Sequence, residues 1–130
     1  MTKTAAREQI TDRWYTRPVL FVSDVSRALR FYVDMLGFEK GWHEGGGTGG
    51  VCQVNRSECE IILCEDATRS GKARLYVELT AEGLATLRRE IVEHSVPSEK
   101  SWWGSDVVKI VDPDGNELLF PAEFQNQSER

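Results

Sequence analysis

The side chains best suited to metal or nucleophilic chemistry are few. His43, Glu44, Cys52 and Cys64 offer donor atoms that metal ions prefer. Their positions match no ligand spacing such as Cys-x-x-Cys or His-x-x-x-His. A cysteine activated by histidine is disfavoured as well, because no motif brings Cys52 or Cys64 beside His43 and buried strand cysteines are usually inert. The sequence therefore predicts no metal site, no cofactor and no catalytic residue.

A glycine-rich stretch, Gly45-Gly46-Gly47-Thr48-Gly49-Gly50, is the only candidate for a phosphate-binding loop. It lacks the Gly-Lys-Ser/Thr of such loops, and no helical pattern follows it to aim an N-terminus at an anion. We therefore expect a flexible connection between strands, able to act as a lid over a pocket.

Tryptophan side chains are the clearest candidates for ligand recognition. Trp42, Trp102 and Trp103 fall in or beside predicted strands, and flat aromatic faces stack on planar heterocycles and on cations. Because side chains alternate along a strand, only one of Trp102 and Trp103 can face a given side. Core packing is the alternative role for each tryptophan. Acidic side chains such as Glu60 and Glu117 could attract a positively charged ligand.

Length and composition describe one globular domain. At 130 residues, with 40% hydrophobic and 28% charged residues, the chain can bury a core. It has no apolar run long enough for a bilayer and no apolar signal segment, so we expect no membrane partner and a cytoplasmic location. A formal net charge of -5 without a basic stripe argues against nucleic acid. Three cysteines in such a chain predict free thiols.

The first half of the chain predicts a strand, a helix, a further strand and a hairpin. The apolar run of residues 19–22 predicts a buried strand. Ser26 is the expected N-cap of the helix that follows, and Gly37 is expected to end it. The helix positions that share one apolar face are Val25, Ala28, Leu29, Tyr32 and Leu36.

Residues 38–44 predict the next strand, and residues 51–54 and 59–64 predict the hairpin. With Arg56-Ser57 as its turn, this hairpin would place Val54 opposite Cys59, and Cys52 opposite Ile61. No two cysteines would then face each other across the strands.

The second half repeats the pattern after a polar linker over residues 66–72. Residues 75–79 predict a strand, and Thr80 is the expected cap of a helix whose apolar face carries Leu84, Leu87 and Ile91, with His94 near its C-terminus. Two strand-like runs then flank Asp112-Pro113-Asp114-Gly115-Asn116. Pro113 suits the second position of a type I turn, and Gly115 can adopt the left-handed conformation that closes a hairpin.

The two halves align with each other. A shift of 55 residues superposes Leu20 on Leu75 and Leu29 on Leu84, and a shift of 56 superposes the hairpins, with Leu63 on Leu119. We therefore predict an α+β fold of two tandem βαβββ modules, residues 17–65 and 72–121, whose curled mixed sheets form a shared cleft. Residues 1–16 would be an N-terminal extension and 122–130 a C-terminal tail.

These motifs resemble the vicinal oxygen chelate superfamily, which includes glyoxalases, extradiol dioxygenases, fosfomycin-resistance enzymes and bleomycin-binding resistance proteins. The first module of that family has a strand, an Asp, a helix with Phe-Tyr and then Leu-Gly-Phe, and its second module ends in Asp-Pro-x-Gly-Asn. The matching residues are Val19 to Val22, Asp24, Phe31-Tyr32, Leu36-Gly37-Phe38, and Asp112 to Asn116. Trp103-Gly104 before the last hairpin is most similar to the bleomycin-resistance branch. The resemblance covers residues 17–121 and is specific for fold rather than activity.

The resemblance also locates four positions that bind a metal in metal-dependent members. Those on the first strand of each module correspond to Arg17, and to Lys72 or Arg74; those on the last strand correspond to Leu63 and Leu119. Leucine cannot bind a metal ion, and a protonated Arg or Lys repels one. The resemblance therefore argues against glyoxalase, dioxygenase and metal-dependent fosfomycin chemistry.

Three functions follow from the resemblance and the missing ligands. The first is metal-free sequestration of a bleomycin-like antibiotic by a homodimer with grooves at its interface. The second is a lyase, isomerase or dioxygenase with displaced metal ligands. The third is a binding module for another molecule, an anionic one if Arg17, Lys72 and Arg74 line the cleft. The expected ligand-binding residues are Arg17, Trp42, His43, Arg74, Trp102, Trp103 and Glu117.

Overall fold

The computed structural model describes residues 14–44, 50–101 and 104–121. Its elements follow in chain order: β1 (Val19–Val22), α2 (Val25–Leu29), the π-helical turn η1 (Arg30–Met35), β2 (Glu39–Glu44), β3 (Val51–Arg56), β4 (Cys59–Glu65), the 3-10 turn η2 (Ala67–Arg69), β5 (Arg74–Tyr76), α3 (Ala81–Glu93), β6 (Ser98–Ser101), β7 (Gly104–Val111) and β8 (Glu117–Pro121). In the described part of the chain, no helix is long and apolar enough to span a membrane.

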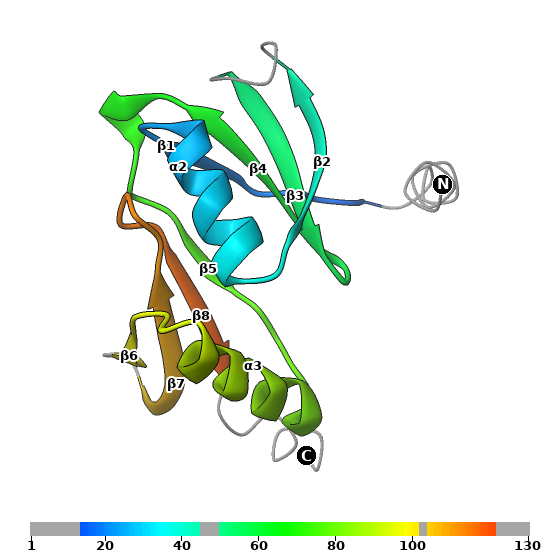
Figure 1. Ribbon diagram of the computed structural model, residues 1–130, viewed down its shortest axis with the longest axis vertical. Helices are drawn as coiled ribbons and strands as arrows, with labels where there is room; N and C mark the ends of the chain where they lie inside the picture. The colour runs from blue at the N-terminus through cyan, green and yellow to red at the C-terminus, as the bar shows by residue number, and fades with distance from the viewer. Residues whose placement is uncertain (1–13, 45–49, 102–103, 122–130) are drawn as a thin grey trace.

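The elements form two successive modules of the same design, each with one mixed sheet (Figure 1). The strand orders are β1-β4-β3-β2 and β5-β8-β7-β6, and only β1 with β4 and β5 with β8 pair in parallel. Helix α2 with η1 packs on the first sheet, and α3 packs on the second. The predicted α+β class and βαβββ repeat are therefore confirmed.

The first helix begins two residues earlier than it would with Ser26 as its N-cap. Asp24 has an extended backbone, and its carboxylate accepts a hydrogen bond from the Arg27 amide, so Asp24 is the N-cap and the prediction of Ser26 is wrong. Gly37 has a φ of +75°, as expected of a residue that ends a helix. In the second module, Thr80 caps α3 as predicted, by accepting a hydrogen bond from the Gly83 amide.

The first hairpin turns one residue later than predicted, at Ser57 and Glu58. Ser57 adopts a φ of +53°, and Val54 lies opposite Ile61 rather than Cys59. No two cysteines face each other, and Cys52, Cys59 and Cys64 are free. Because the turn is displaced, Glu58 stands at the tip of the hairpin.

The pairing registers confirm the repeat and correct part of its alignment. Leu20 lies opposite Leu63, and Leu75 lies opposite Leu118, so the first and last strands of the modules both shift by 55 residues. Leu63 therefore corresponds to Leu118, and the predicted match with Leu119 is wrong. The two hairpins also differ in their turns, because five residues connect β7 to β8 and two connect β3 to β4.

The buried apolar side chains of both modules form one hydrophobic core cluster. In the first module its members include Leu20, Val22, Val25, Tyr32, Ile61 and Leu63. In the second module they include Leu84, Leu87, Ile110, Leu118 and Phe120. Strand β5 is shorter than predicted because it ends at Tyr76, although the Val77 amide still donates to the Leu119 carbonyl of β8.

A buried carboxylate organises the turn between β7 and β8. Asp112 Oδ1 accepts hydrogen bonds from the Asp114 and Asn116 amides, both 2.9 Å long. Its Oδ2 accepts from Asn116 Nδ2 and from the Tyr32 hydroxyl of the first module, again at 2.9 Å. Burial, and then the negative charge of Asp112, hold the pKa of Tyr32 well above its usual value of 10.0, so the hydroxyl keeps the proton that it donates.

The same turn makes further hydrogen bonds to the first module. Asn116 Nδ2 donates to the Phe21 carbonyl at 3.0 Å. Asp114 Oδ1 accepts from the Ser23 amide at 3.1 Å and from the Arg27 guanidinium at 3.0 Å. These bonds, with that of Tyr32, fix the end of β1 against the start of β8 and so set how the modules are placed.

Gly71, in the connection between the modules, should be sensitive to substitution. Its φ is +79°, and an added Cβ would lie 2.0 Å from the Asp114 carbonyl oxygen. We expect Gly71→Ala to lower the free energy of unfolding by about 2–3 kcal/mol, measured by urea denaturation. Gly83→Ala is the control, because Gly83 is helical and its added Cβ meets neighbours only at 3.4 Å or more. Equal stabilities of the two variants would contradict this role of Gly71.

Candidate functional site

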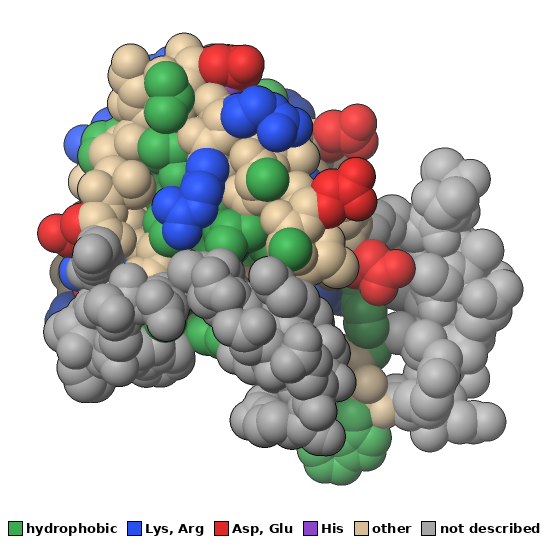
Figure 2. Space-filling view, turned by 90° about the horizontal axis from the view of Figure 1, so that it is seen from below, with side chains coloured by type: hydrophobic (Ala, Val, Ile, Leu, Met, Phe, Trp, Pro, Cys, Tyr) green, Lys and Arg blue, Asp and Glu red, His purple; other side chains and the backbone are tan. Residues whose placement is uncertain are grey.

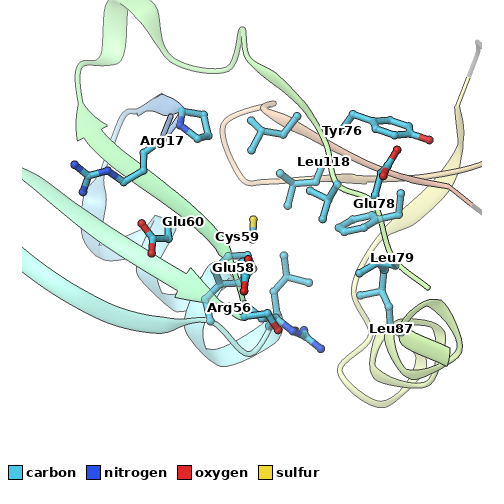
Figure 3. Close-up of a pocket in the computed structure, with 18 of the residues that line it drawn as sticks. Arg17, Arg56, Glu58, Cys59, Glu60, Tyr76, Glu78, Leu79, Leu87 and Leu118 are labelled. Carbon is cyan, nitrogen blue, oxygen red and sulfur yellow. The ribbon is translucent and has the colours of Figure 1, made fainter. Parts of the chain in front are cut away.

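A cavity of about 970 Å³ lies between the two modules (Figure 3). The first module contributes the residues just before β1, the end of η1 and the tip of the β3–β4 hairpin. The second contributes β5, residues 77–79, the first turns of α3, and β8. The cavity is at the upper end of the size range of small-molecule pockets.

The walls of the cavity are largely apolar. Leu36 and Phe38 line it from the first module, and Leu79, Leu87 and Leu118 line it from the second. Figure 3 shows Leu118, Leu79 and Leu87 on the side opposite Cys59 and Glu58. A ligand with apolar surface would therefore be taken out of water by both modules.

Cys59 is the only thiol among the described residues that line the cavity. Burial raises the pKa of this thiol above its ordinary value, with a smaller opposing effect from Arg56. The thiol therefore stays protonated at neutral pH and is a poor nucleophile. Cys59 acts chemically as part of the apolar wall.

Arg56 bridges the modules at one end of the cavity. Its Nη1 donates to the Leu36 carbonyl at 2.6 Å and lies 2.9 Å from Glu90 Oε1 on α3. Its Nη2 donates to the other Glu90 oxygen at 3.2 Å. The side chains of Arg56 and Glu90 are 32% and 29% exposed. This partial burial strengthens their ion pair relative to a fully solvated one.

Arg17 and Arg74, both predicted site residues, line the cavity. Arg74 Nε donates to Glu117 Oε1 at 3.0 Å, across the β5–β8 pair. Arg17 Nη1 donates to Gln53 Oε1 at 2.7 Å, and the guanidinium lies over the Tyr15 ring. The structure thus brings two of the seven predicted residues to one cavity.

Three further predicted residues, Trp42, His43 and Glu117, do not line the cavity. Trp42 Nε1 donates to Gln53 Oε1 at 2.8 Å, so Trp42 and Arg17 share a partner, although Trp42 does not line the cavity. His43 lies opposite Cys52 in the β2–β3 pair, near Lys40. Glu117 binds Arg74 beside the cavity, and Trp102 and Trp103 fall outside the described residues.

Several cavity residues gave no signal in the sequence. Glu58 occupies a hairpin turn whose position depends on the backbone of Ser57, and Glu78 follows a strand that ends earlier than its composition suggests. Leu118 and Phe120 were recognisable as core residues, but not as cavity residues. Their exposure to the cavity arises from the placement of the modules.

The expected metal positions do not fit a metal ion. Arg17 and Arg74 are cationic and already hydrogen bonded, and Leu63 is fully buried in the first core. Leu119, at 4% exposure, is buried as well, and Lys72 precedes β5. In the described ranges, no group of three or more His, Cys, Asp or Glu side chains could hold a metal.

The nearest carboxylates are already engaged. Glu60 accepts a hydrogen bond from the Tyr15 hydroxyl, and Glu117 is bound by Arg74 and lies 3.6 Å from the Lys109 ammonium. A metal at either position would have to displace a cation or a hydroxyl donor. The residues present therefore do not support a metal-dependent step.

On the face seen in Figure 2, the Lys and Arg side chains of the described residues share the surface with acidic and hydrophobic ones. This agrees with the formal net charge of -5.

Comparisons with known proteins agree on the fold. A family model described as "Glyoxalase superfamily protein" matches residues 4–127. The bleomycin-binding protein of Streptomyces verticillus, solved with copper(II)-bleomycin, superposes with a TM-score of 0.64 at 24% identity over 84% of this chain and 95% of that one. TnmS3, an antibiotic binding protein from Streptomyces sp. CB03234, gives 0.64 at 23% identity over 83% and 94%. A lactoylglutathione lyase from Agrobacterium tumefaciens gives 0.64 at 16% over 82% and 92%. No sequence among the curated proteins matches significantly.

Divalent metals should not stabilise this protein. We expect the unfolding midpoint of chelator-treated protein to stay unchanged when Zn²⁺, Mn²⁺ or Ni²⁺ is added in excess, because cations and leucines occupy the four positions considered. Differential scanning fluorimetry measures this directly. A saturable, stoichiometric rise with one of these metals would contradict the interpretation.

Proposed function

The chain belongs to the glyoxalase superfamily, and from that premise we propose that it is a metal-free binding protein that holds a small, largely apolar molecule in the cavity between its modules. The observation that carries the proposal is the cavity itself: about 970 Å³, walled by leucines from both modules, with charged side chains around them. Such a site can desolvate a ligand, but it offers no activated nucleophile or metal centre to transform one.

A bleomycin-like antibiotic is the ligand that we propose first. Three of the similar structures carry names that state bleomycin or antibiotic binding, one of them in complex with copper(II)-bleomycin and one with bleomycin. At about 20–24% identity these neighbours support the fold and suggest a ligand to test. The biological role would be sequestration, in which one protein chain removes one ligand molecule from solution without turnover.

We further propose that the protein forms a homodimer. Among the described residues, the most exposed large apolar side chains are Trp14 at 98%, Val92 at 78% and Val19 at 45%. A dimer would allow part of this surface to be covered. Size-exclusion chromatography with light scattering would report the mass, and a monomer at micromolar concentration would exclude this assembly.

Sequestration predicts that metal-free bleomycin stabilises the protein. At a hundredfold its dissociation constant, a ligand adds about 2.7 kcal/mol to the free energy of unfolding, which raises the midpoint on the order of several degrees. The shift should disappear in Leu79→Trp, because a larger side chain at this partly buried cavity position occupies ligand space.

Ala85→Trp is the matched control for that variant. Ala85 lies on α3, is exposed and does not line the cavity, so its substitution should leave the shift intact. No shift in the wild-type protein would remove bleomycin as the ligand, while an equal shift in Leu79→Trp would place any bound antibiotic outside the cavity.

A further inference from the structure

The charged side chains of the cavity specify what kind of ligand it accepts. Six of them line it: Arg17, Arg56, Arg74, Glu58, Glu60 and Glu78. Their formal charges cancel, so a count does not favour either sign. The sign of the ligand charge that the cavity favours therefore depends on which of these six charges are already neutralised by a neighbour.

Two of the three arginines are neutralised by carboxylates that do not line the cavity. Arg56 forms its ion pair with Glu90 at 2.9 Å, and Arg74 forms its pair with Glu117 at 3.0 Å. Neither guanidinium is therefore available to an anionic ligand without breaking an existing ion pair. This removes the main reason to expect an anionic ligand from Arg74.

Arg17 and Glu60 balance each other. Val19 lies opposite Ile62 in the parallel pair of β1 and β4, and continuing this register by two residues brings Arg17 beside Glu60 on the same face. Both side chains also have partners there, Gln53 for Arg17 and the Tyr15 hydroxyl for Glu60. In Figure 3 both side chains lie at the edge of the cavity, on the first module.

Two carboxylates remain, Glu58 and Glu78. Both are exposed, and neither forms a hydrogen bond or an ion pair within the described part of the chain. Glu58 stands at the tip of the β3–β4 hairpin and Glu78 on the strand-like segment before α3, so they line the cavity from different modules (Figure 3). The negative charge of the cavity that is not neutralised therefore comes from both sides.

We infer that the ligand is a cation with a flat or compact apolar body, whose positive charge interacts with Glu58 and Glu78 while the leucine walls cover its apolar part. This inference rests on the proposed binding function and narrows it to one class of ligand. It also reverses the expectation that Arg17 and Arg74 would select an anion, since neither has an unbalanced charge toward the cavity.

Three fluorescent probes that share one aromatic body test the inference. They are 1-pyrenemethylammonium, 1-pyrenemethanol and 1-pyrenecarboxylate, titrated against the wild-type protein at low salt. Each exposed ion pair changes a dissociation constant by about fivefold at most. With both Glu58 and Glu78 as partners, we expect the ammonium to bind about tenfold more tightly than the alcohol, and the carboxylate to bind most weakly. The advantage of the ammonium should shrink in 0.5 M NaCl.

Variants separate this charge effect from the apolar effect. Glu58→Gln/Glu78→Gln should weaken binding of the ammonium about tenfold and leave binding of the alcohol unchanged. The control is Glu39→Gln/Glu93→Gln, which alters net charge equally at two exposed positions that do not line the cavity, and it should leave all three affinities unchanged.

The outcomes distinguish the two levels of the proposal. If the alcohol or the carboxylate binds as tightly as the ammonium, the cation inference is overturned while cavity binding stands. If none of the three probes binds, the proposed function fails, and the inference fails with it. If the control variant weakened binding of the ammonium as much as the cavity variant does, the preference for a cation would come from the overall net charge. That result would also overturn the inference.

Discussion

The hydrogen bonds of the Asp112 carboxylate are the constraint on which the rest of the molecule depends. This carboxylate is 97% buried, closes its own turn through two amides and receives the Tyr32 hydroxyl from the other module. An unsatisfied buried carboxylate would be costly, so the bonds are effectively obligatory once the turn is buried. Asn116 extends them to the Phe21 carbonyl, and the two modules are thereby joined at the end of β1.

The cavity follows from this junction and from an imperfection in the repeat. Because β5 is only three residues long, Val77 and Leu79 lie beyond its end, and both remain partly buried. Leu118 and Leu87 then face both their own core and the space beside the first module. On the far side, Arg56 and its partners keep the β3–β4 hairpin near α3. An apolar space bounded by both modules results, and it is the basis of the binding function.

Local sequence patterns could predict the fold because strands, helix ends and turns depend on nearby residues. The repeat also helped, because each element assigned in one module has a counterpart in the other. The site could not be predicted in the same way. Glu58 reaches the cavity only because Ser57 takes a φ of +53°, which moves the hairpin turn by one residue. The Arg56–Glu90 ion pair joins residues 34 positions apart in different modules, so only the placement of the modules creates it. The exposed state of Glu78 depends likewise on where β5 ends.

The most direct test of the account is an NMR measurement of where a ligand sits. With methyl-labelled protein and 1-pyrenemethylammonium, we expect intermolecular NOEs from the pyrene protons to the methyl groups of Leu79, Leu87 and Leu118, which line the cavity from the second module. NOEs to Val19 and Ile62 instead, on the open face of the first sheet, would contradict it, because the ligand would then bind the sheet surface rather than the cavity between the modules.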